Sequence, residues 1–151
     1  MKNLYLANAL VTDKDGRMLA VRKRNSIYFQ MVGGKIDGAE KPIQALEREF
    51  KEEINININS HKVSFLGNYS TKAVNEENTL VNATIFHVQL NSTNKIKIDA
   101  EIEEVVWVTK EDYKNYQFAH LLREFSLPIW LNMKVLIFFI NIYVTLWLVV
   151  Y

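Results

Sequence analysis

The segment at residues 33–56, GGKIDGAEKPIQALEREFKEEINI, constrains the fold more than any other part of the chain. Its apolar residues recur at a spacing that places them on one face of a helix: Ile43, Leu46, Phe50 and Ile54. Pro42 suits the first turn of that helix, where its missing N–H costs nothing. The segment therefore predicts an amphipathic helix whose apolar face meets a core, preceded by a glycine pair where the backbone can turn tightly or approach a ligand.

Stretches with strand character lie on both sides of this helix. They are residues 4–12, 18–24, 28–32, 63–72, 79–90 and 103–109. The Asp15-Gly16 dipeptide between the first two is a strong turn signal and predicts a hairpin. Turns of helix are expected at residues 110–113 and 118–125. Strands interrupted by one central helix and closed by another predict an α/β sandwich.

The length of 151 residues suits one domain and is too short for two ordinary ones. We expect that domain at residues 1–130, followed by an apolar tail at 131–151. The 18 Lys and Arg against 17 Asp and Glu leave a net charge of +1, which gives no general electrostatic reason to bind long nucleic acid. The absence of cysteine excludes disulfides, a thiolate nucleophile and Cys-based metal sites. Because the first residues lack the pattern of a signal peptide, we expect a cytoplasmic domain.

Three carboxylates, Glu49, Glu52 and Glu53, crowd one turn of the predicted helix. Like charges at this spacing destabilise a helix by roughly 0.2–0.5 kcal/mol per pair, so the cluster needs a counter-charge. Arg48 can supply one, and a divalent cation neutralises the cluster better. Oxygen-only ligands suit Mg²⁺, which commonly shares its coordination shell with substrate phosphates. The alternative is a solvated acidic helix face, which is what most charge runs are.

The same residues carry a resemblance to a known family. The spacing of the Nudix box is reproduced by Gly34, Glu40, Arg48-Glu49, Phe50, Glu52-Glu53 and Ile56. Asn55 stands where the family has glycine at the helix end, and Asn is the next-best residue for the left-handed conformation wanted there. Val32 stands where many relatives have proline before the two glycines. The chain thus resembles the Nudix superfamily over about residues 3–130.

The resemblance implies a Nudix fold, an α/β/α sandwich with a mixed β-sheet and the Nudix loop-helix. It also implies that the box holds Mg²⁺, or Mn²⁺ as a substitute, through Gly34 (by its carbonyl), Glu49, Glu52 and Glu53. Glu40 and Arg48 would pair to brace the loop and the helix. The catalytic residues implied are Glu52, Glu53 and Glu101. Glu101 is favoured as the general base and Glu53 comes second, with Glu103 and Glu104 as other acids of the same stretch.

Basic residues near the box are candidates for holding substrate phosphates: Arg22, Arg24 and Lys35. Strand alternation would point Arg22 and Arg24 to the same face, and ordinary solvation at a strand end is the alternative for each. The three histidines, His61, His87 and His120, are not spaced as a metal site. We therefore interpret them as structural or surface residues.

The resemblance further implies hydrolysis of a diphosphate bond in a nucleoside diphosphate linked to another group. Small bacterial pyrophosphohydrolases that convert oxidised nucleoside triphosphates such as 8-oxo-dGTP to monophosphate and pyrophosphate look most similar. Other nucleoside triphosphates, dinucleoside polyphosphates, nucleotide sugars and ADP-ribose stay open as substrates. A nucleotide-binding or regulatory module without catalysis is the alternative, although its usual mark is a broken carboxylate cluster. A monomer or a homodimer with a small-molecule partner is expected.

The last residues, 135–151, form an uncharged apolar run interrupted only by Asn141 and Thr145. As a helix the run would span about 25 Å, slightly short of the roughly 30 Å hydrocarbon core of a membrane. A C-terminal membrane anchor that leaves the domain in the cytoplasm is one interpretation, with Lys134 at the boundary. A packed or dimer-forming segment is the second, and a fusion or frame-shift product that begins near Met133 is the third.

Overall fold

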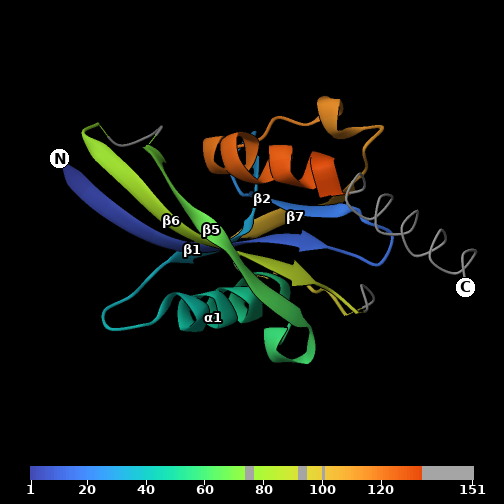
Figure 1. Ribbon diagram of the computed structural model, residues 1–151, viewed down its shortest axis with the longest axis horizontal. Coiled ribbons are helices and arrows are strands. Elements are labelled where there is room, and N and C mark those ends of the chain that lie inside the picture. The colour runs from blue at the N-terminus through green and yellow to red at the C-terminus, as the bar shows by residue number, and fades with distance from the viewer. Residues whose placement is uncertain (74–76, 92–94, 100, 134–151) are drawn as a thin grey trace, which may run out of the picture.

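The computed structural model describes residues 1–73, 77–91, 95–99 and 101–133 (Figure 1). Its strands are β1 (Lys2–Thr12), β2 (Met18–Lys23), β3 (Phe29–Gln30), β4 (Val32–Lys35), β5 (Lys62–Lys72), β6 (Thr79–Gln89) and β7 (Ile102–Val108). Its helical elements are α1 (Pro42–Ile54), the short 3₁₀ turns η1 (Ile58–Ser60) and η2 (Tyr113–Asn115), and the π-helical segment η3 (Leu122–Ser126). The sheet and the helices together make the α/β arrangement that the sequence predicts.

The sheet is mixed, and β1 lies in its middle and pairs with three other strands. β1 pairs in parallel with β6 along its whole length, from Lys2 opposite Thr79 to Thr12 opposite Gln89. On its other side the residues at 6–9 pair with β4, whereas the end of the strand pairs with β2 in the predicted hairpin. Outer strands extend the sheet, with β5 beside β6 and both β3 and β7 beside β2. Because β1 changes partner halfway along, β4 and β2 diverge and leave room for a pocket between them.

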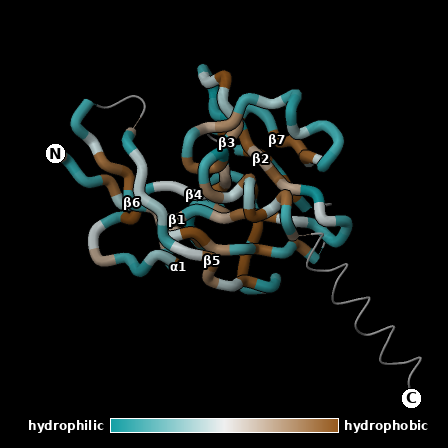
Figure 2. Tube along the Cα trace, turned by 45° about the horizontal axis from the view of Figure 1, so that its top comes forward, coloured by the Kyte–Doolittle hydropathy of each residue, from teal (hydrophilic) through white to brown (hydrophobic). Residues whose placement is uncertain are grey.

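Helices cover both faces of the sheet, as Figure 1 shows for α1 on one side and the C-terminal helical residues on the other. The first core lies under α1, where Leu46, Phe50 and Ile54 are fully buried against strand residues. The second lies under the C-terminal helix and includes Leu122 and Trp130. The brown apolar stretches along the central strands in Figure 2 mark this double-sided burial. The structure is therefore an α/β/α sandwich, as the sequence predicts.

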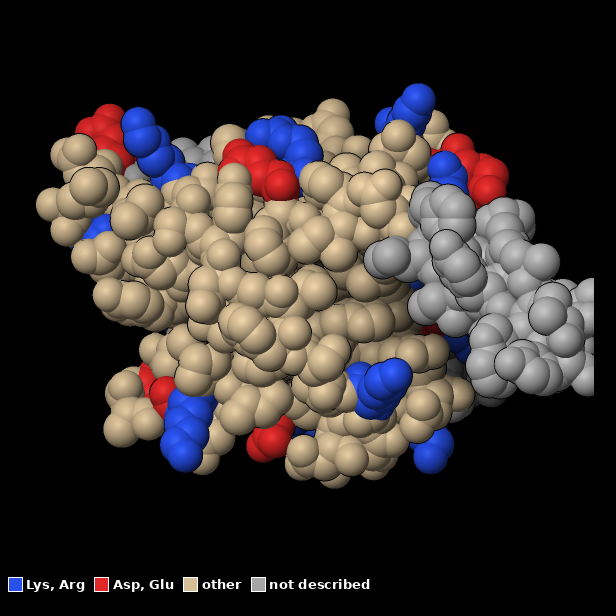
Figure 3. Space-filling model, viewed as in Figure 1, with Lys and Arg blue, Asp and Glu red and all other residues tan. Residues whose placement is uncertain are grey.

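The edge strand β5 lies across the face seen in Figure 3. Charged side chains on this face are gathered around its rim, and the centre is largely uncharged. Phe65 is exposed on β5 and makes an edge-to-face contact with Phe86 of β6. Gly67 of the same strand is packed against the ring of Phe125, so the C-terminal helix lies directly on the sheet here.

The glycine pair lies inside a strand, so of the two expectations for that segment, a tight turn or a close approach to a ligand, the tight turn is wrong. Gly33 and Gly34 belong to β4 and pair with Asn8 and Ala7 of β1. The helix after them begins at Pro42 as predicted, and it ends at Asn55 in the left-handed conformation (φ 55°, ψ 37°). The expectation that asparagine can replace the family glycine at this helix end is confirmed.

The C-terminal helical stretch is longer than the sequence suggested. Residues 120–133 are helical, with η3 at their centre, where the predicted segment ended at residue 125. Trp130 is fully buried and its Nε1–H donates to the carbonyl of Gly16 at 2.8 Å. Leu131 and Met133 also pack against the second core, so helical structure continues across the predicted boundary at 130/131.

The apolar run at 135–151 lies outside the described residues. Among the helices that the structure does describe, none is both long enough and apolar enough to cross a membrane.

Candidate active site

Strand β4 lies against two neighbours at its glycine pair, with Gly34 next to Glu49 of α1 and Gly33 next to β1. A side chain at Gly34 would collide with the carboxylate of Glu49, and one at Gly33 would collide with the backbone of Ala7 and with Asn8. Gly33 also has a φ of 136°, which residues with a side chain rarely adopt. The glycine pair therefore brings the backbone of β4 against the acidic face of α1.

Arg48 ties the loop before α1 to the acidic face of the helix. Its Nε and Nη2 donate to the two carboxylate oxygens of Glu40 at 2.9 and 3.0 Å, and its Nη2 also donates to the Lys35 carbonyl at 2.9 Å. Its Nη1 donates to Glu49 Oε1 at 2.8 Å and lies 3.5 Å from Glu52 Oε2. The hydrogen bonds from Arg48, with a further one from the Asp37 N–H, lower the pKa of Glu40 to about 2. The structure thus brings together the pair that the resemblance implies.

Glu53 is the buried member of the carboxylate cluster, at 5% exposed. The Gly33 N–H donates to its Oε2 at 3.1 Å. Its Oε1 has no hydrogen-bond partner among the described residues, and the nearest cation, Lys23 Nζ, is 3.6 Å away. Burial raises the pKa of Glu53 to about 7, although the Gly33 hydrogen bond and the Lys23 charge oppose the rise. A positive group near Oε1 would lower the free-energy cost of burying the ionised carboxylate.

Lys23 lies between Glu53 and Glu101 and is a basic residue of the site. Its Nζ contacts Glu101 Oε2 at 2.9 Å. Burial lowers the pKa of Lys23, but the Glu101 hydrogen bond and the charges of Glu53, Glu101 and Glu49 outweigh it, and the net pKa is raised. The hydrogen bond with Lys23 in turn lowers the pKa of Glu101, which is 71% exposed. Both groups are therefore charged at neutral pH.

The two arginines predicted as phosphate ligands lie elsewhere. Arg22 donates to Glu104 and Glu103 at 2.8 Å each and stacks over the ring of Phe29. Neither Arg22 nor Arg24 lines the pocket described below, whereas Lys23 between them does. β2 ends at Lys23, and its pairing with β7 shifts between Arg22 and Lys23, so simple strand alternation does not tell which of these basic residues faces the pocket.

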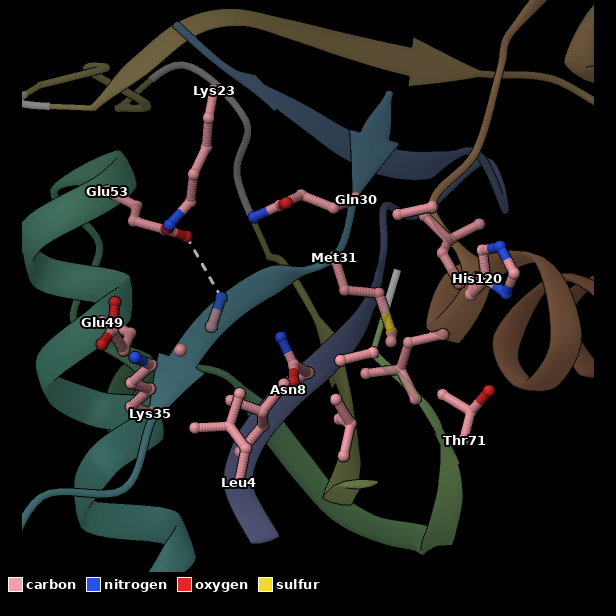
Figure 4. A pocket seen from close by; sticks show the side chains of 18 of the residues that line it. Leu4, Asn8, Lys23, Gln30, Met31, Lys35, Glu49, Glu53, Thr71 and His120 are labelled. Carbon is pink, nitrogen blue, oxygen red and sulfur yellow. Dashed lines mark hydrogen bonds and ion pairs between the residues drawn. The ribbon is translucent and has the colours of Figure 1, made fainter. Parts of the chain in front are cut away.

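A pocket of about 750 Å³ opens beside the carboxylates, within the range of small-molecule sites (Figure 4). One end is formed by charged residues: Lys23, Lys35, Asp37, Glu49, Glu52, Glu53 and Glu101. Its middle is mainly apolar, with Leu4, Leu6, Met31 and Val81 around the amides of Asn8 and Gln30. The far end carries Thr71 and His120. All predicted site residues of the box and its flanks except Arg22, Arg24, Glu40 and Arg48 therefore line one pocket.

His120 was missed in the sequence, where it was interpreted as structural or surface. Its Nδ1 lies 2.9 Å from Glu124 Oε1, and Glu124 Oε2 accepts hydrogen bonds from Tyr69 and Thr71 at 3.0 Å each. This network fixes the His120 ring at the pocket wall. π-Helical segments such as η3, which contains Glu124, occur frequently at functional sites.

The donor set fits a hard divalent cation in chemical type. The charged end offers carboxylate oxygens from α1 and a glycine strand beside them, and one buried oxygen of Glu53 has no partner among the described residues. In the residues that the structure describes, no three His, Asp or Glu side chains already converge on one metal position, and Arg48 Nη1 lies 2.8 Å from Glu49 Oε1. Glu49, Glu52 and Glu53 are the side chains that would hold an ion here.

Comparisons with known proteins identify the fold. A model of the NUDIX domain family matches residues 3–127. Among solved structures, the MutT protein of Methanosarcina mazei is 21% identical with a TM-score of 0.67, and the match covers 82% of this chain and 90% of that one. The dihydroneopterin triphosphate pyrophosphohydrolase of E. coli is 17% identical with a TM-score of 0.70, covering 82% and 94%.

An Ap4A hydrolase of C. elegans is 20% identical with a TM-score of 0.65, and the match covers 83% of this chain and 97% of that one. A search of curated proteins found no matching sequence. The structural likenesses establish the fold, and the family match spans nearly all the described residues. The chain therefore belongs to the NUDIX domain family and has the fold of the Nudix hydrolases.

Proposed function

We propose that this chain is a Nudix pyrophosphohydrolase that converts a nucleoside triphosphate, including oxidised forms such as 8-oxo-dGTP, to a monophosphate and pyrophosphate. The observation that supports this most is the charged end of the pocket. There the acidic face of α1, the glycine strand β4 and Lys23 meet beside an apolar cavity large enough for a nucleotide. The phosphates would lie at the charged end and the nucleoside in the apolar part.

Most residues of the charged end have a role in this proposal. Glu49, Glu52 and Glu53 hold Mg²⁺, for which Mn²⁺ can substitute, and the Gly34 carbonyl is the neutral ligand. The bound metal supplies charge neutralisation on the phosphates and a lowered pKa for the attacking water. Lys23 and Lys35 bind phosphate oxygens, and Arg48 with Glu40 holds the loop and helix in place. Arg22 and Arg24 are left with an ion-pairing and strand-end role.

The reaction is addition of water to one phosphorus and departure of the pyrophosphate. The water oxygen forms a bond to phosphorus, the bridging P–O bond breaks, and the water proton passes to a carboxylate. Glu101 is the proposed proton acceptor because it is exposed to solvent at the pocket, and the Lys23 contact keeps it ionised at neutral pH. Glu53 is the second candidate, although its assignment as a metal ligand competes with that role.

The test is a hydrolysis panel on the full chain, with and without Mg²⁺, that identifies products by mass. The panel contains 8-oxo-dGTP, the ordinary nucleoside triphosphates, ADP-ribose, nucleotide sugars and dinucleoside polyphosphates. We expect Mg²⁺-dependent release of a nucleoside monophosphate that is lost in Glu52→Gln. Glu47→Gln is the matched control, since Glu47 is on the same helix but does not line the pocket.

Incorporation of ¹⁸O from labelled water identifies the phosphorus that is attacked. If no member of the panel is hydrolysed by the folded protein, the proposal is wrong and a binding module takes its place. Release of products that Glu52→Gln does not reduce would also contradict it, because the carboxylate cluster would then have no part in the reaction.

A further inference from the structure

The wall of the pocket contains a buried amide whose oxygen accepts no hydrogen bond from the described part of the chain. Asn8 lies in β1 and is 6% exposed. Its Oδ1 has no hydrogen-bond partner among the described residues. A buried acceptor without a donor costs about 1–3 kcal/mol, and buried polar groups of this kind are normally satisfied. A group from a bound ligand would remove that cost.

Asn8 is unusual because it is polar, whereas its neighbours at the pocket-facing positions of β1 are apolar. Alternation along the strand points Leu4, Leu6 and Asn8 to the same side, and all three line the pocket. Leucine at the third position would complete an apolar wall. The chain instead places an amide there, where it is fully surrounded and has no structural partner for its oxygen among the described residues.

The position of Asn8 relative to the carboxylates limits what it can touch. Asn8 is paired with Gly33 across the β1–β4 register, and the Gly33 N–H binds Glu53. Its amide nitrogen packs over Gly33, 2.8 Å from where a side chain there would begin. Figure 4 shows Asn8 between the carboxylates of α1 on one side and His120 on the other. Asn8 is therefore next to the phosphate end without being part of it.

The unit next to the phosphates of a nucleotide is the sugar. If the phosphates are bound at the charged end, as proposed above, the sugar would lie over Asn8 and the base would extend toward His120, given how these residues lie in Figure 4. A sugar hydroxyl donates an O–H, which is the group that the Asn8 oxygen lacks. Resting on the proposed function, we propose that Asn8 accepts a hydrogen bond from a hydroxyl of the nucleotide sugar and so determines the specificity of the enzyme for that sugar.

The experiment compares four triphosphates of one base, namely the ribonucleotide and its 2′-deoxy, 3′-deoxy and 2′,3′-dideoxy forms. In the wild-type chain, loss of the contacting hydroxyl is expected to lower kcat/KM by about tenfold or more, since the site then leaves a buried acceptor unpaired. In Asn8→Leu, which has a similar shape and no acceptor, the same loss is expected to have no effect. The control is Asn3→Leu on the same strand outside the pocket, which should keep the wild-type preference.

A measurement on the wild-type chain avoids dependence on the folding of the variant. The side-chain amide resonance of Asn8 in ¹⁵N-labelled protein is expected to shift with the 5′-monophosphate product and not with its 2′,3′-dideoxy form. Equal kcat/KM for all four triphosphates in the wild type would overturn the inference while leaving the hydrolase in place. An Asn8→Leu variant that changes preference between bases but not between sugars would overturn it too. Absence of any turnover would instead show that the proposed function fails.

Discussion

Burial of Glu53 makes the free energy of unfolding of the metal-free chain fall as the pH rises. Its pKa of about 7 in the folded state exceeds its ordinary value of 4.5, so the folded chain binds more protons than the unfolded chain between these pH values. The free energy of unfolding then falls as pH rises through this window and the loss is complete above about pH 7. At about 1.4 kcal/mol per pKa unit, the loss is at most ~3 kcal/mol.

Replacing the carboxylate with an amide should remove this loss. Glu53→Gln keeps an oxygen for the Gly33 N–H and cannot ionise, so we expect it to be more stable than the wild type by about 1–3 kcal/mol at pH 8 with a chelator present. The difference should vanish near pH 4.5. Added Mg²⁺ should raise the free energy of unfolding of the wild-type chain again and leave that of the variant unchanged, since the cation neutralises the buried charge.

Urea unfolding at 25 °C over pH 4.5–8, followed by circular dichroism, measures the free energy of unfolding of the wild type and of Glu53→Gln at each pH. Glu47→Gln, on the same helix and outside the pocket, is the control and should follow the wild type. The reasoning is refuted if wild type and Glu53→Gln lose stability in parallel across this range. That outcome would mean that Glu53 is not buried in the folded chain in solution.

Three further predictions concern the same region. Gly33→Ala should lower the free energy of unfolding by about 3 kcal/mol through its collision with the backbone of Ala7 and Asn8 and through its positive φ, whereas Gly38→Ala, which meets open space, should cost only about 1 kcal/mol from its positive φ; equal losses in urea unfolding would contradict this. Because the pKa of Glu40 is about 2, its contribution to stability is present above pH 4.5 and lost as pH falls toward 2, so the gap in thermal midpoint between wild type and Glu40→Gln should close over that interval. Glu101→Gln should reduce kcat for the best triphosphate by about 10²-fold or more with a small change in KM, and an unchanged kcat would assign proton transfer to another group.

Short-range sequence patterns predicted much of the fold correctly. The apolar spacing at Ile43, Leu46, Phe50 and Ile54 placed α1 correctly, since a helix face depends only on residues three and four apart. The same spacing gathered the acids on one face, and the resemblance to the Nudix box implied that Glu40 and Arg48 pair. The β1–β2 hairpin was readable because an Asp-Gly turn is a short-range signal.

Features that depend on strand register were not readable in this way. Asn8 lies beside Gly33 because of the β1–β4 register, and Lys23 lies at the point where the β2–β7 register shifts, between Glu53 of α1 and Glu101. A shift of one residue in a strand would turn Lys23 away and bring Arg22 and Arg24 inward. Strand alternation tells which residues share a face but not which face meets the site. Arg22 and Arg24 were therefore predicted as phosphate ligands in place of Lys23.

The sequence by itself determined the family and the acidic helix, since these follow from residue type and short spacing. Only the tertiary structure decided which cation approaches the buried carboxylate, that the glycine pair lies in a strand, and that Asn8 and His120 face the pocket. The physical reason is that these relations join residues far apart in the chain. They come from how β1 is shared among three strands and from how the helices close the two faces of the sheet.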